Sequence, residues 1–490
     1  MSGTSPLYST HAARSLDERA TEALGGDAYV LMQRAGQAAW RHLLLHWPDA
    51  QRIVVVCGPG SNGGDGYVLA RHAQRAGRSV EVVHLPAHVP GNPVAQRACT
   101  DYVAAGGRVV LFEDALPKGD VVVDALFGIG LSRAPDAHAR ALVDAINAQV
   151  VPVFALDVPS GVDADHGSAP GAAVLATRTL QFIARHAGLY TGDALEYTGA
   201  LDLDDLDVPA GAFDGVPPRA DWLEYDALAR WLLPRRRNTH KGESGHVLCI
   251  GGDEGSGGAI ALCAEAALRA GAGLAGVATR AVHVAALLAR TPEAMVRAVE
   301  STGDLSPMLE RARVVAVGPG LGQGEWGRAL FQHAVRGGKP LVVDADALNL
   351  LAASPQALED AILTPHPGEA ARLLGCATAD VQRDRFGAAT AIAQRHAAVV
   401  VLKGAGTVVA APAQTPRVIG AGNPGMAVGG MGDVLTGVVA ALRAQGLSAF
   451  DAASAGALLH AAAGDAAAWD GERGLLPSDL FPHVRRLANP

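Results

Sequence analysis

Short apolar runs, separated by helix-length amphipathic segments, constrain the fold of this chain more than any other feature. The runs are IVVVC (53–57), VVVDALF (121–127), VPVFALD (151–157), GHVLCI (245–250), VVAVG (314–318), LVVDA (341–345) and VVVLKG (399–404). Runs of this length without polar alternation are typical of strands buried on both faces of a parallel sheet. Because they alternate with helical segments, the sequence predicts an α/β fold with helices on both sides of each sheet.

Length and composition together predict two large domains. At 490 residues the chain exceeds what one hydrophobic core ordinarily organises. Its apolar fraction of 49% with 18% charged residues is that of a packed globular protein and not of a disordered one. The Pro- and Gly-rich segment LDVPAGAFDGVPPRADW (206–222) lacks periodicity and is the best candidate linker. We therefore expect domains at residues 1–217 and 218–490.

The charge distribution argues against a nucleic-acid or membrane partner. The net charge is −9, and the acidic residues are spread along the chain and not gathered in a tail. One basic run, Arg235, Arg236 and Arg237, fits either a nucleotide phosphate site or a solvated loop, and the loop is the preferred interpretation. Any phosphate binding is therefore expected to be local.

The cysteines and the N-terminus point to a reducing compartment. The five cysteines are far apart, with no C-x-x-C pair and no histidine cluster at metal-ligand spacing in the sequence, so reduced buried thiols are expected. The N-terminus lacks the charged start and apolar core of a signal peptide. Glu265 and Arg269 interrupt the longest stretch of small apolar residues. We expect a cytoplasmic protein.

A glycine-rich turn follows the first predicted strand, in CGPGSNGGDGYVLARHAQRAG (57–77). Gly58, Gly60 and Gly63 satisfy the G-x-G-x-x-G pattern, in which backbone N–H groups and a helix N-terminus face a phosphate. A dinucleotide site also needs an acidic residue at the end of the second strand, whereas SVEVVHLP (79–86) ends in apolar and histidine residues. The turn alone is therefore a weak indication of function.

Two further strand tips make the pattern specific. VDALFGIGLSR (123–133) and LDVPSGVDADHG (156–167) each place an aspartate and glycines after a predicted strand, and three such tips can converge on one pocket. Together with the glycine-rich turn they resemble the YjeF N-terminal family, the NAD(P)H-hydrate epimerases. The resemblance covers nearly all of residues 25–200 and implies a Rossmann-like α/β/α sandwich.

The resemblance to the epimerases implies roles for individual residues. Asn62, Asp124 and Ser160 would bind a potassium ion through oxygen atoms. Asp157 would be the acid–base group or an orienting contact at the hydrated nicotinamide ring, and this acid role requires burial or a partner because an ordinary aspartate is a poor acid at neutral pH. The hydrated nucleotide would contact Ser61, Asn62, Gly63, Gly64 and Asp65, and Gly128, Ile129, Gly130, Leu131, Ser132, Arg133 and Ala134.

Alternatives remain open for these residues. Without the resemblance, Asp124 and Asp157 could simply cap the turns that follow their strands. In addition, similar proteins often carry a lysine in a stretch F-x-x-x-K-x-G-L, whereas FIARHAGLY (182–190) offers Arg185 and His186. We therefore assign no catalytic lysine, and whether His186 takes its place is open at this stage.

The second half of the chain carries a different set of motifs. Its glycine-rich or polar segments are THKGESGHVLCIGGDEGSGG (239–258), VGPGLGQG (317–324), VVDADALNLLA (342–352), LTPHPGEAARLLG (363–375), VVLKGAGTVV (400–409) and GNPGMAVGGMGDVLTGVVAAL (422–442). In the last of these a glycine-rich turn directly precedes an apolar helix, with Asp433 at its mouth. Free N–H groups and the helix dipole there favour an anion, and a carboxylate beside them suits phosphoryl transfer.

This half resembles the ribokinase-like fold and, within it, the ADP-dependent NAD(P)H-hydrate dehydratases, over about residues 235–445. The resemblance implies that Asp433 is the base and that Ala259, Gly322 and His366 contact the hydrated nucleotide. The ADP site would be lined by Lys403, Gly404, Ala405, Gly406, Thr407 and Gly432. The implied reaction phosphorylates the ring hydroxyl and then eliminates phosphate, with Mg²⁺ neutralising the phosphates.

Simpler readings exist for three of these residues. His366 lies between two prolines and could be a loop histidine with all its hydrogen bonds satisfied. Lys403 could be a surface lysine at the end of a strand. Asp433 could be the N-cap of the helix that follows it, although the surrounding glycines favour an anion site.

The two halves together predict a bifunctional repair enzyme for NAD(P)HX, the hydrated forms of NADH and NADPH. The epimerase would supply the isomer that the dehydratase uses. Two alternatives are a small-molecule kinase in the second half and a nucleotide-sensing or interaction module in the first. We also expect a homo-oligomer, for which small-residue helices such as residues 259–273 could form interfaces, although the same residues suit internal packing.

Overall fold

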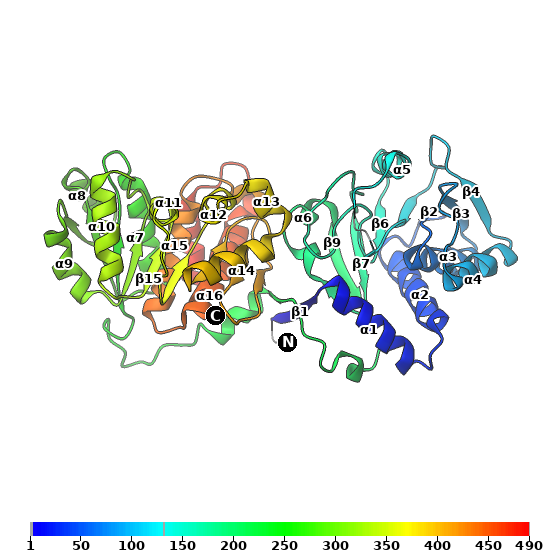
Figure 1. The fold of residues 1–490 in the computed structure, drawn as a ribbon, viewed down its shortest axis with the longest axis horizontal. Helices are drawn as coiled ribbons and strands as arrows, with labels where there is room; N and C mark the ends of the chain where they lie inside the picture. The colour runs from blue at the N-terminus through cyan, green and yellow to red at the C-terminus, as the bar shows by residue number, and fades with distance from the viewer. Residues whose placement is uncertain (1–2, 131–132, 490) are drawn as a thin grey trace. The chain divides into compact units, whose positions relative to one another are not determined.

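A computed structural model describes residues 3–130 and 133–489 of the chain. By internal contacts the chain divides into two compact units, Pro6–Ala220 and Asp221–Pro490, the second including Met1–Ser5 (Figure 1). Among the described residues, no helix has both the length and the apolarity that crossing a bilayer would need.

The first unit, Pro6–Ala220, is built on a seven-stranded sheet in which every pairing is parallel. Its strands, in spatial order, are β4 (Arg108–Leu111), β3 (Ser79–His84), β2 (Arg52–Cys57), β5 (Val121–Ala125), β6 (Val153–Leu156), β7 (Arg178–Phe182) and β9 (Ala200–Asp204). A two-residue strand, β8 (Arg185–His186), pairs with the end of β1 (Thr4–Tyr8). The order reverses between β2 and β5, and such a reversal is where open parallel sheets bind ligands.

Helices cover both faces of this sheet because its strands are apolar on both sides. Ile53, Val55 and Cys57 of β2 enter one hydrophobic core, whereas Val54 and Val56 enter the other. The first core is closed by α2 (Ala28–His46), α3 (Ser61–Arg75) and α4 (Pro93–Ala104), which pack side by side, and the second by α5 (Ala137–Asn147). A short α6 (Ala194–Tyr197) follows β8.

The helical opening of the chain is broken into two helices. The first helix, α1 (Thr10–Ala23), ends before α2 begins. Gly25 and Gly26 both have positive φ, at 96° and 85°, and Asp27 caps α2 by accepting a hydrogen bond from Tyr29 N. The break lets α1 take a direction different from that of α2 (Figure 1).

The second unit, Asp221–Pro490, contains a larger, mostly parallel sheet. Its strands, in spatial order, are β13 (Met295–Ala298), β12 (Leu274–Thr279), β11 (His246–Ile250), β14 (Val314–Val317), β15 (Leu341–Val343), β16 (Ala361–Leu363), β17 (Val399–Leu402), β18 (Val408–Ala410), β19 (Arg417–Ile419) and β10 (Ala220–Leu223). The pairs β17–β18 and β18–β19 are antiparallel, and the others are parallel. The order reverses between β11 and β14, which again marks a ligand-binding edge.

The helices of this unit complete an α/β/α sandwich. They are α7 (Gly257–Arg269), α8 (Val284–Arg290), α9 (Thr302–Arg311), α10 (Glu325–Arg336), α11 (Ala345–Ala353), α12 (Pro367–Leu374), α13 (Thr378–Arg383), α14 (Arg385–His396), α15 (Met431–Ala444), α16 (Ala449–Ala467) and α17 (Leu480–Leu487). The core on one side joins α7, α15, α16 and α17 to alternate residues of the strands.

Helices α7 and α15 approach each other very closely through small residues. A Cβ added at Gly437 of α15 would lie 2.1 Å from the carbonyl oxygen of Cys263 in α7. The small residues of segment 259–273 therefore serve internal packing here. Oligomerisation through that segment stays a prediction.

The cysteines are free, as expected, but not all of them are buried. Cys57, Cys249 and Cys263 are buried, Cys99 is partly exposed and Cys376 is exposed. The expectation of buried thiols is therefore wrong for Cys376, which follows the C-terminal end of α12.

Candidate active sites

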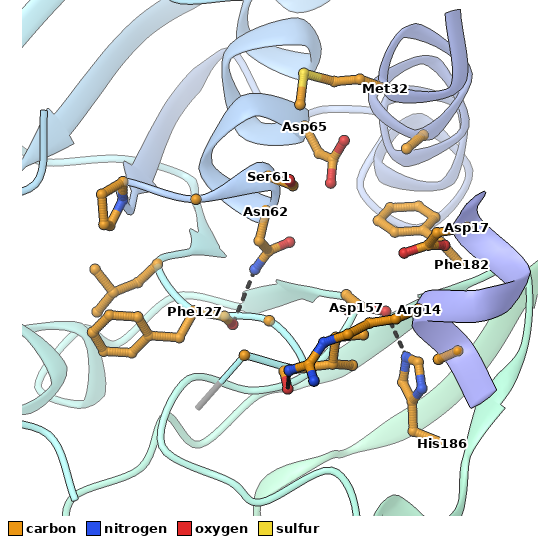
Figure 2. A pocket seen from close by; sticks show the side chains of 18 of the residues that line it. Arg14, Asp17, Met32, Ser61, Asn62, Asp65, Phe127, Asp157, Phe182 and His186 are labelled. Atoms are coloured by element: carbon orange, nitrogen blue, oxygen red, sulfur yellow. Dashed lines mark hydrogen bonds and ion pairs between the residues drawn. The ribbon is translucent and has the colours of Figure 1, made fainter. Parts of the chain in front are cut away.

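A cavity of about 760 Å³ opens at the reversal point of the sheet in the first unit. Its lining comes from the segments that follow β2, β5 and β6 and from the helices α1 and α2. Figure 2 shows Asp17, Asn62, Asp65 and Asp157 around this cavity, with His186 beside Asp157. The three strand tips that the sequence singled out do therefore converge.

Asp157 sits at the tip of β6 in a backbone conformation that non-glycine residues rarely adopt, with φ at 64°. Its Oδ1 lies 2.7 Å from Nε2 of His186, whose side chain is only 1% exposed. His186 N donates to Oε1 of Gln181, which fixes the backbone that carries the ring. The imidazole Nδ1 is buried and has no hydrogen-bond partner among the described residues. The hydrogen bond of the ring is therefore directed at Asp157 alone.

The electrostatics of the cavity favour groups that exchange protons near neutral pH. Burial disfavours the charged imidazole, but Asp157 outweighs this and raises the pKa of His186. Loss of hydration and the Asp157 carboxylate raise the pKa of Asp17 to about 7, although Asp17 is an exposed residue. Burial, followed by Asp157 and Asp17, raises the pKa of Asp65 well above its usual range. Asp17 and Asp65 therefore resist ionisation beside the Asp157 carboxylate.

A second polar cluster lies behind the cavity floor. Asp124, fully buried on β5, accepts hydrogen bonds from Ser160 Oγ at 2.6 Å and Ser160 N at 2.8 Å. Ser160 Oγ also accepts from Phe127 N, and Asn62 Nδ2 donates to the Phe127 carbonyl at 3.0 Å. Asn62 Oδ1 is buried and has no partner among the described residues. Burial raises the pKa of Asp124 to about 6 despite these hydrogen bonds.

Several positions around the cavity must be glycine, because other atoms lie too close to leave room for a side chain. A Cβ at Gly58 would lie 1.7 Å from the carbonyl oxygen of Leu126, and one at Gly63 would lie 2.0 Å from the carbonyl oxygen of Gly58. A Cβ at Gly128 would meet the Asp157 carboxylate at 3.1 Å and the Asn62 side chain at 3.3 Å. Gly58 and Gly63 of the G-x-G-x-x-G pattern are therefore required by tight packing, whereas a Cβ at Gly60 would meet nothing within 4 Å.

Most of the nucleotide contacts expected from the resemblance line the cavity, but not all. The lining residues among them are Ser61, Asn62, Asp65, Gly128, Ile129, Gly130, Arg133, Ala134 and Asp157. Gly63 and Gly64 are buried in the first turn of α3 and are not among the lining residues. Leu131 and Ser132 lie outside the described residues.

In the second unit, a buried network connects the ends of two strands and a helix. Lys403, after β17, donates from Nζ to Asp344 Oδ1 at 2.8 Å. Thr436 of α15 donates to the other oxygen of Asp344 at 2.9 Å. The Asp344 side chain is 2% exposed and that of Lys403 is 20% exposed. Lys403 is therefore not a surface lysine, and its charge is held at the head of α15.

Asp433 lies in the first turn of α15, directly after the glycine-rich turn. Gly430 precedes the helix with φ at 99°, a conformation that favours glycine. The N-cap of α15 is Gly430 and Asp433 is the third residue of the helix, so Asp433 is not its N-cap. A Cβ at Gly432 would lie 3.1 Å from Lys403 Nζ. The helix N-terminus and the lysine thus face the same point, which suits an anion.

Several carboxylates lie close to Lys403 and the N-terminus of α15, and they shift the pKa of Asp433. Burial, followed by the charge of Asp344, raises the pKa of Asp433 to about 7, with Asp346 and Glu369 adding to the effect and Lys403 opposing it. Burial also raises the pKa of Glu369 to about 7. A carboxylate with such a pKa can take a proton at neutral pH, which an ordinary aspartate does poorly.

His366 begins α12 and has defined partners. Its backbone N donates to Glu369 Oε2 at 2.8 Å, and its Nδ1 accepts from Gly368 N at 3.0 Å. Burial, followed by Lys403, lowers the pKa of the imidazole, so it is neutral at pH 7. The ring is a capping group whose side chain is 50% exposed. These contacts are compatible with the interpretation of His366 as a loop histidine with satisfied hydrogen bonds. The exposed half of the side chain stays accessible.

The remaining predicted residues surround this network in different ways. Gly322 donates its N–H to Asp346 Oδ2 at 2.8 Å, and Asp346 is one of the groups that act on Asp433. A Cβ at Gly320 would meet Ala259 at 3.3 Å, which places Ala259 beside the same loop. Gly404 and Gly406 have positive φ in the partly exposed loop between β17 and β18, which also contains Ala405 and Thr407. Arg235, Arg236 and Arg237 are exposed, as a solvated loop requires.

Sequence reasoning did not identify several residues of these sites. Asp17 lies on an amphipathic helix with no motif around it, and only the fold brings it to Asp157. Asp344 and Glu369 stand inside two of the quoted motifs, but the resemblance assigned them no role. The sequence did contain an indication of both residues. In DADALNLL and TPHPGEA an acidic residue follows a strand end or lies close to one.

Comparisons with known proteins match both units separately and the chain as a whole. Residues 28–188 match the family model described as YjeF-related protein N-terminus, and residues 247–486 match the model described as NAD(P)H-hydrate dehydratase. A ribokinase-like superfamily protein from Enterococcus faecalis is 30% identical, with a TM-score of 0.52, covering 55% of this chain and 96% of that one. The expected ribokinase-like fold of the second unit is thereby confirmed.

Relatives of the same domain organisation align from end to end. The bifunctional NAD(P)H-hydrate repair enzyme Nnr of Coxiella burnetii is 47% identical over 99% of both chains. The enzyme of the same name from Escherichia coli is 46% identical over 97% of this chain and 92% of its own. The chain therefore belongs to the family of bifunctional NAD(P)H-hydrate repair enzymes.

Proposed function

We propose that the chain restores hydrated NADH and NADPH in two steps. The first unit interconverts the R and S epimers, and the second dehydrates the S epimer at the expense of ADP, with release of AMP and phosphate. The observation that carries this proposal is that each unit directs a carboxylate, Asp157 or Asp433, to the ligand-binding edge of its sheet. The proposed domains are residues 1–217 and 218–490, close to the change of unit after Ala220.

For epimerisation, Asp157 and His186 form the proton-handling pair. Inverting the carbon that bears the hydroxyl requires a bond at that carbon to break and form again, and a paired acid and base beside the ring assists both events. His186 supplies the partner that an aspartate needs for this role, at 2.7 Å and out of contact with solvent. The loops at Ser61–Asp65 and Gly128–Ala134 hold the nucleotide.

The cluster behind the cavity floor fits a potassium ion. Asn62 Oδ1 is a buried oxygen without a partner among the described residues, and Asp124 and Ser160 supply two further oxygens close by. A hard monovalent cation prefers oxygen ligands of this kind. The ion would offset the charge of buried Asp124 and hold the loops after β2 and β5 in the geometry that shapes the cavity.

For dehydration, Asp433 takes the proton of the ring hydroxyl as its oxygen attacks the β-phosphate of ADP. This forms the phosphate ester and AMP. Phosphate then leaves its ring carbon and a proton leaves the neighbouring ring carbon to water, which restores the ring double bond, because phosphate is a far better leaving group than hydroxide. Lys403 and the N–H groups at the start of α15 stabilise the charge on the transferred group. Ala259, Gly322 and His366 contact the hydrated nucleotide, and Gly404–Thr407 with Gly432 contact ADP.

The donor groups at this site also fit magnesium. Glu369 and Asp433 act on the charge of Lys403, as Asp344 does, and Asp346 acts on Asp433, so the oxygens of this group are suited to a hard divalent cation. When bound, Mg²⁺ neutralises charge on the phosphates of ADP. We further propose that the protein acts in the cytoplasm as a homo-oligomer, without nucleic-acid or membrane partners.

The proposed function is tested by supplying the purified chain with mixed hydrated NADH epimers, ADP and Mg²⁺. The absorbance of the dihydronicotinamide should return for both epimers, with AMP and phosphate appearing in equal amounts. Accumulation of a stable phosphorylated product, with no return of absorbance, would instead establish a small-molecule kinase.

A further inference from the structure

A group of nitrogen and oxygen donors lies on α2 and β9, and neither proposed reaction uses it. No histidine cluster at metal-ligand spacing was expected from the sequence, and this expectation is wrong for His42 and His46. They are four residues apart on α2, so their rings project from the same face of the helix. Asp202 belongs to β9, the edge strand of the same sheet. One ligand atom from each of the three side chains lies within 4.8 Å of the other two. None of these residues lines the cavity that holds Asp157.

The individual distances show how the group is arranged. His46 Nε2 lies 3.6 Å from Asp202 Oδ2, and His42 Nδ1 lies 4.0 Å from the same oxygen. His42 Nδ1 is buried and has no hydrogen-bond partner among the described residues. Two ring nitrogens thus converge on one carboxylate oxygen, and one of them has no partner that explains its position.

We propose that His42, His46 and Asp202 form a binding site for a transition-metal ion of the Zn²⁺ type. Imidazole nitrogen and carboxylate oxygen are ligands that Zn²⁺ prefers, at about 2 Å each. Tetrahedral ligands at that distance are about 3.3 Å apart, so a small inward movement of the side chains completes the site. The side chains are 21% to 25% exposed, which leaves a fourth position for water.

The surroundings supply the outer contacts that such a site needs. Asp204 Oδ2 lies 3.6 Å from His42 Nε2, the ring nitrogen that would not bind the metal. A carboxylate in this position orients a ligating imidazole and raises its basicity. Arg178 donates to Asp202 Oδ2 at 2.6 Å, and a ligating carboxylate retains further lone pairs for a metal.

The same arginine also acts against the site. Its charge repels a cation bound beside Asp202, so the two imidazoles and the carboxylate must outweigh this repulsion.

The test measures Zn²⁺ binding to the full chain, prepared without a polyhistidine tag and stripped with a chelator. Calorimetric titration at pH 7 should show one tight site per chain, and Zn²⁺ should raise the melting temperature. His42→Ala and His46→Ala should each weaken that site at least 10-fold and remove the thermal shift. His11→Ala is the matched control, because His11 is exposed on α1 and belongs to no such group.

Two results would overturn the proposal. One is Zn²⁺ binding of unchanged affinity and stoichiometry in both His42→Ala and His46→Ala, which would place the metal elsewhere. The other is the lack of a tight stoichiometric site in the native chain. Retained interconversion of the R and S epimers by the variants shows that they are folded.

Discussion

At the scale of single residues, the two sites use aspartates whose surroundings differ. Asp433 is surrounded by other carboxylates, and its pKa is raised to about 7 by burial and by the charge of Asp344. Asp157 is instead paired with a buried imidazole at 2.7 Å, in a strained backbone conformation with φ at 64°. The surroundings of Asp433 favour a carboxylate that both accepts and releases a proton near neutral pH. The surroundings of Asp157 favour a carboxylate and an imidazole that share a proton.

The Asp157–His186 pair predicts a pH-dependent effect of substituting His186. The pKa of His186 is raised in the folded chain, so its pairing stabilises the fold fully below the unfolded pKa of about 6.5. That contribution is lost as the pH rises through the folded-state pKa. The loss of stability in His186→Gln should therefore be largest below about pH 6.5 and should shrink at higher pH, as calorimetric unfolding across this range would measure.

The same substitution should slow interconversion of the epimers by about 100-fold, because one member of the proton-handling pair is missing. Dehydration of the pure S epimer by the second unit should be unchanged. His186→Lys is the matched control, since a lysine ammonium group can also pair with Asp157 and donate a proton, and it should recover most of the rate. Equal rates for the native chain and His186→Gln would contradict the role assigned to His186.

At the scale of helices and strands, the sequence predicted the strands well and the tertiary contacts poorly. The run at 53–57 became β2 and the run at 399–404 became β17, because continuous apolar stretches have few other places to lie. The position of Asp17 beside Asp157 could not be predicted, since it depends on how α1 leaves the break at Gly25. His186 stood in a recognised motif, but only the fold shows that its ring meets Asp157.

The close contact between α7 and α15 predicts a strong effect of a single methyl group. In Gly437→Ala the new Cβ would lie 2.1 Å from the Cys263 carbonyl oxygen, so the helices must separate. We expect this to destabilise the second unit by about 1–3 kcal/mol. Gly303→Ala in α9 is the control, because its Cβ meets only Ser301 Oγ at 3.6 Å.

Alanine in place of an exposed helical glycine should stabilise α9 by about 0.5–1 kcal/mol. Denaturant unfolding of both variants measures the two effects. A Gly437→Ala chain as stable as the native one would show that α7 and α15 can move apart without cost, against the packing described here.

At the scale of the whole molecule, the two units repeat one principle. The first has a parallel sheet and the second a mostly parallel one. The strand order reverses after the third strand of each, and each unit places glycine turns and an aspartate at the ligand-binding edge. The 59 glycines of the chain are consistent with this, since several of these turns admit no Cβ. Joining the units in one chain supplies every copy of the dehydratase with an epimerase for the isomer that it does not use.

The most direct test of two separate sites uses the pure R epimer of hydrated NADH with ADP and Mg²⁺. The native chain should restore the dihydronicotinamide absorbance from it. Asp157→Ala should fail with the R epimer but succeed with the S epimer, whereas Asp433→Asn should fail with both and still interconvert them. Loss of both activities in either folded variant, or unchanged use of the R epimer by Asp157→Ala, would contradict the account.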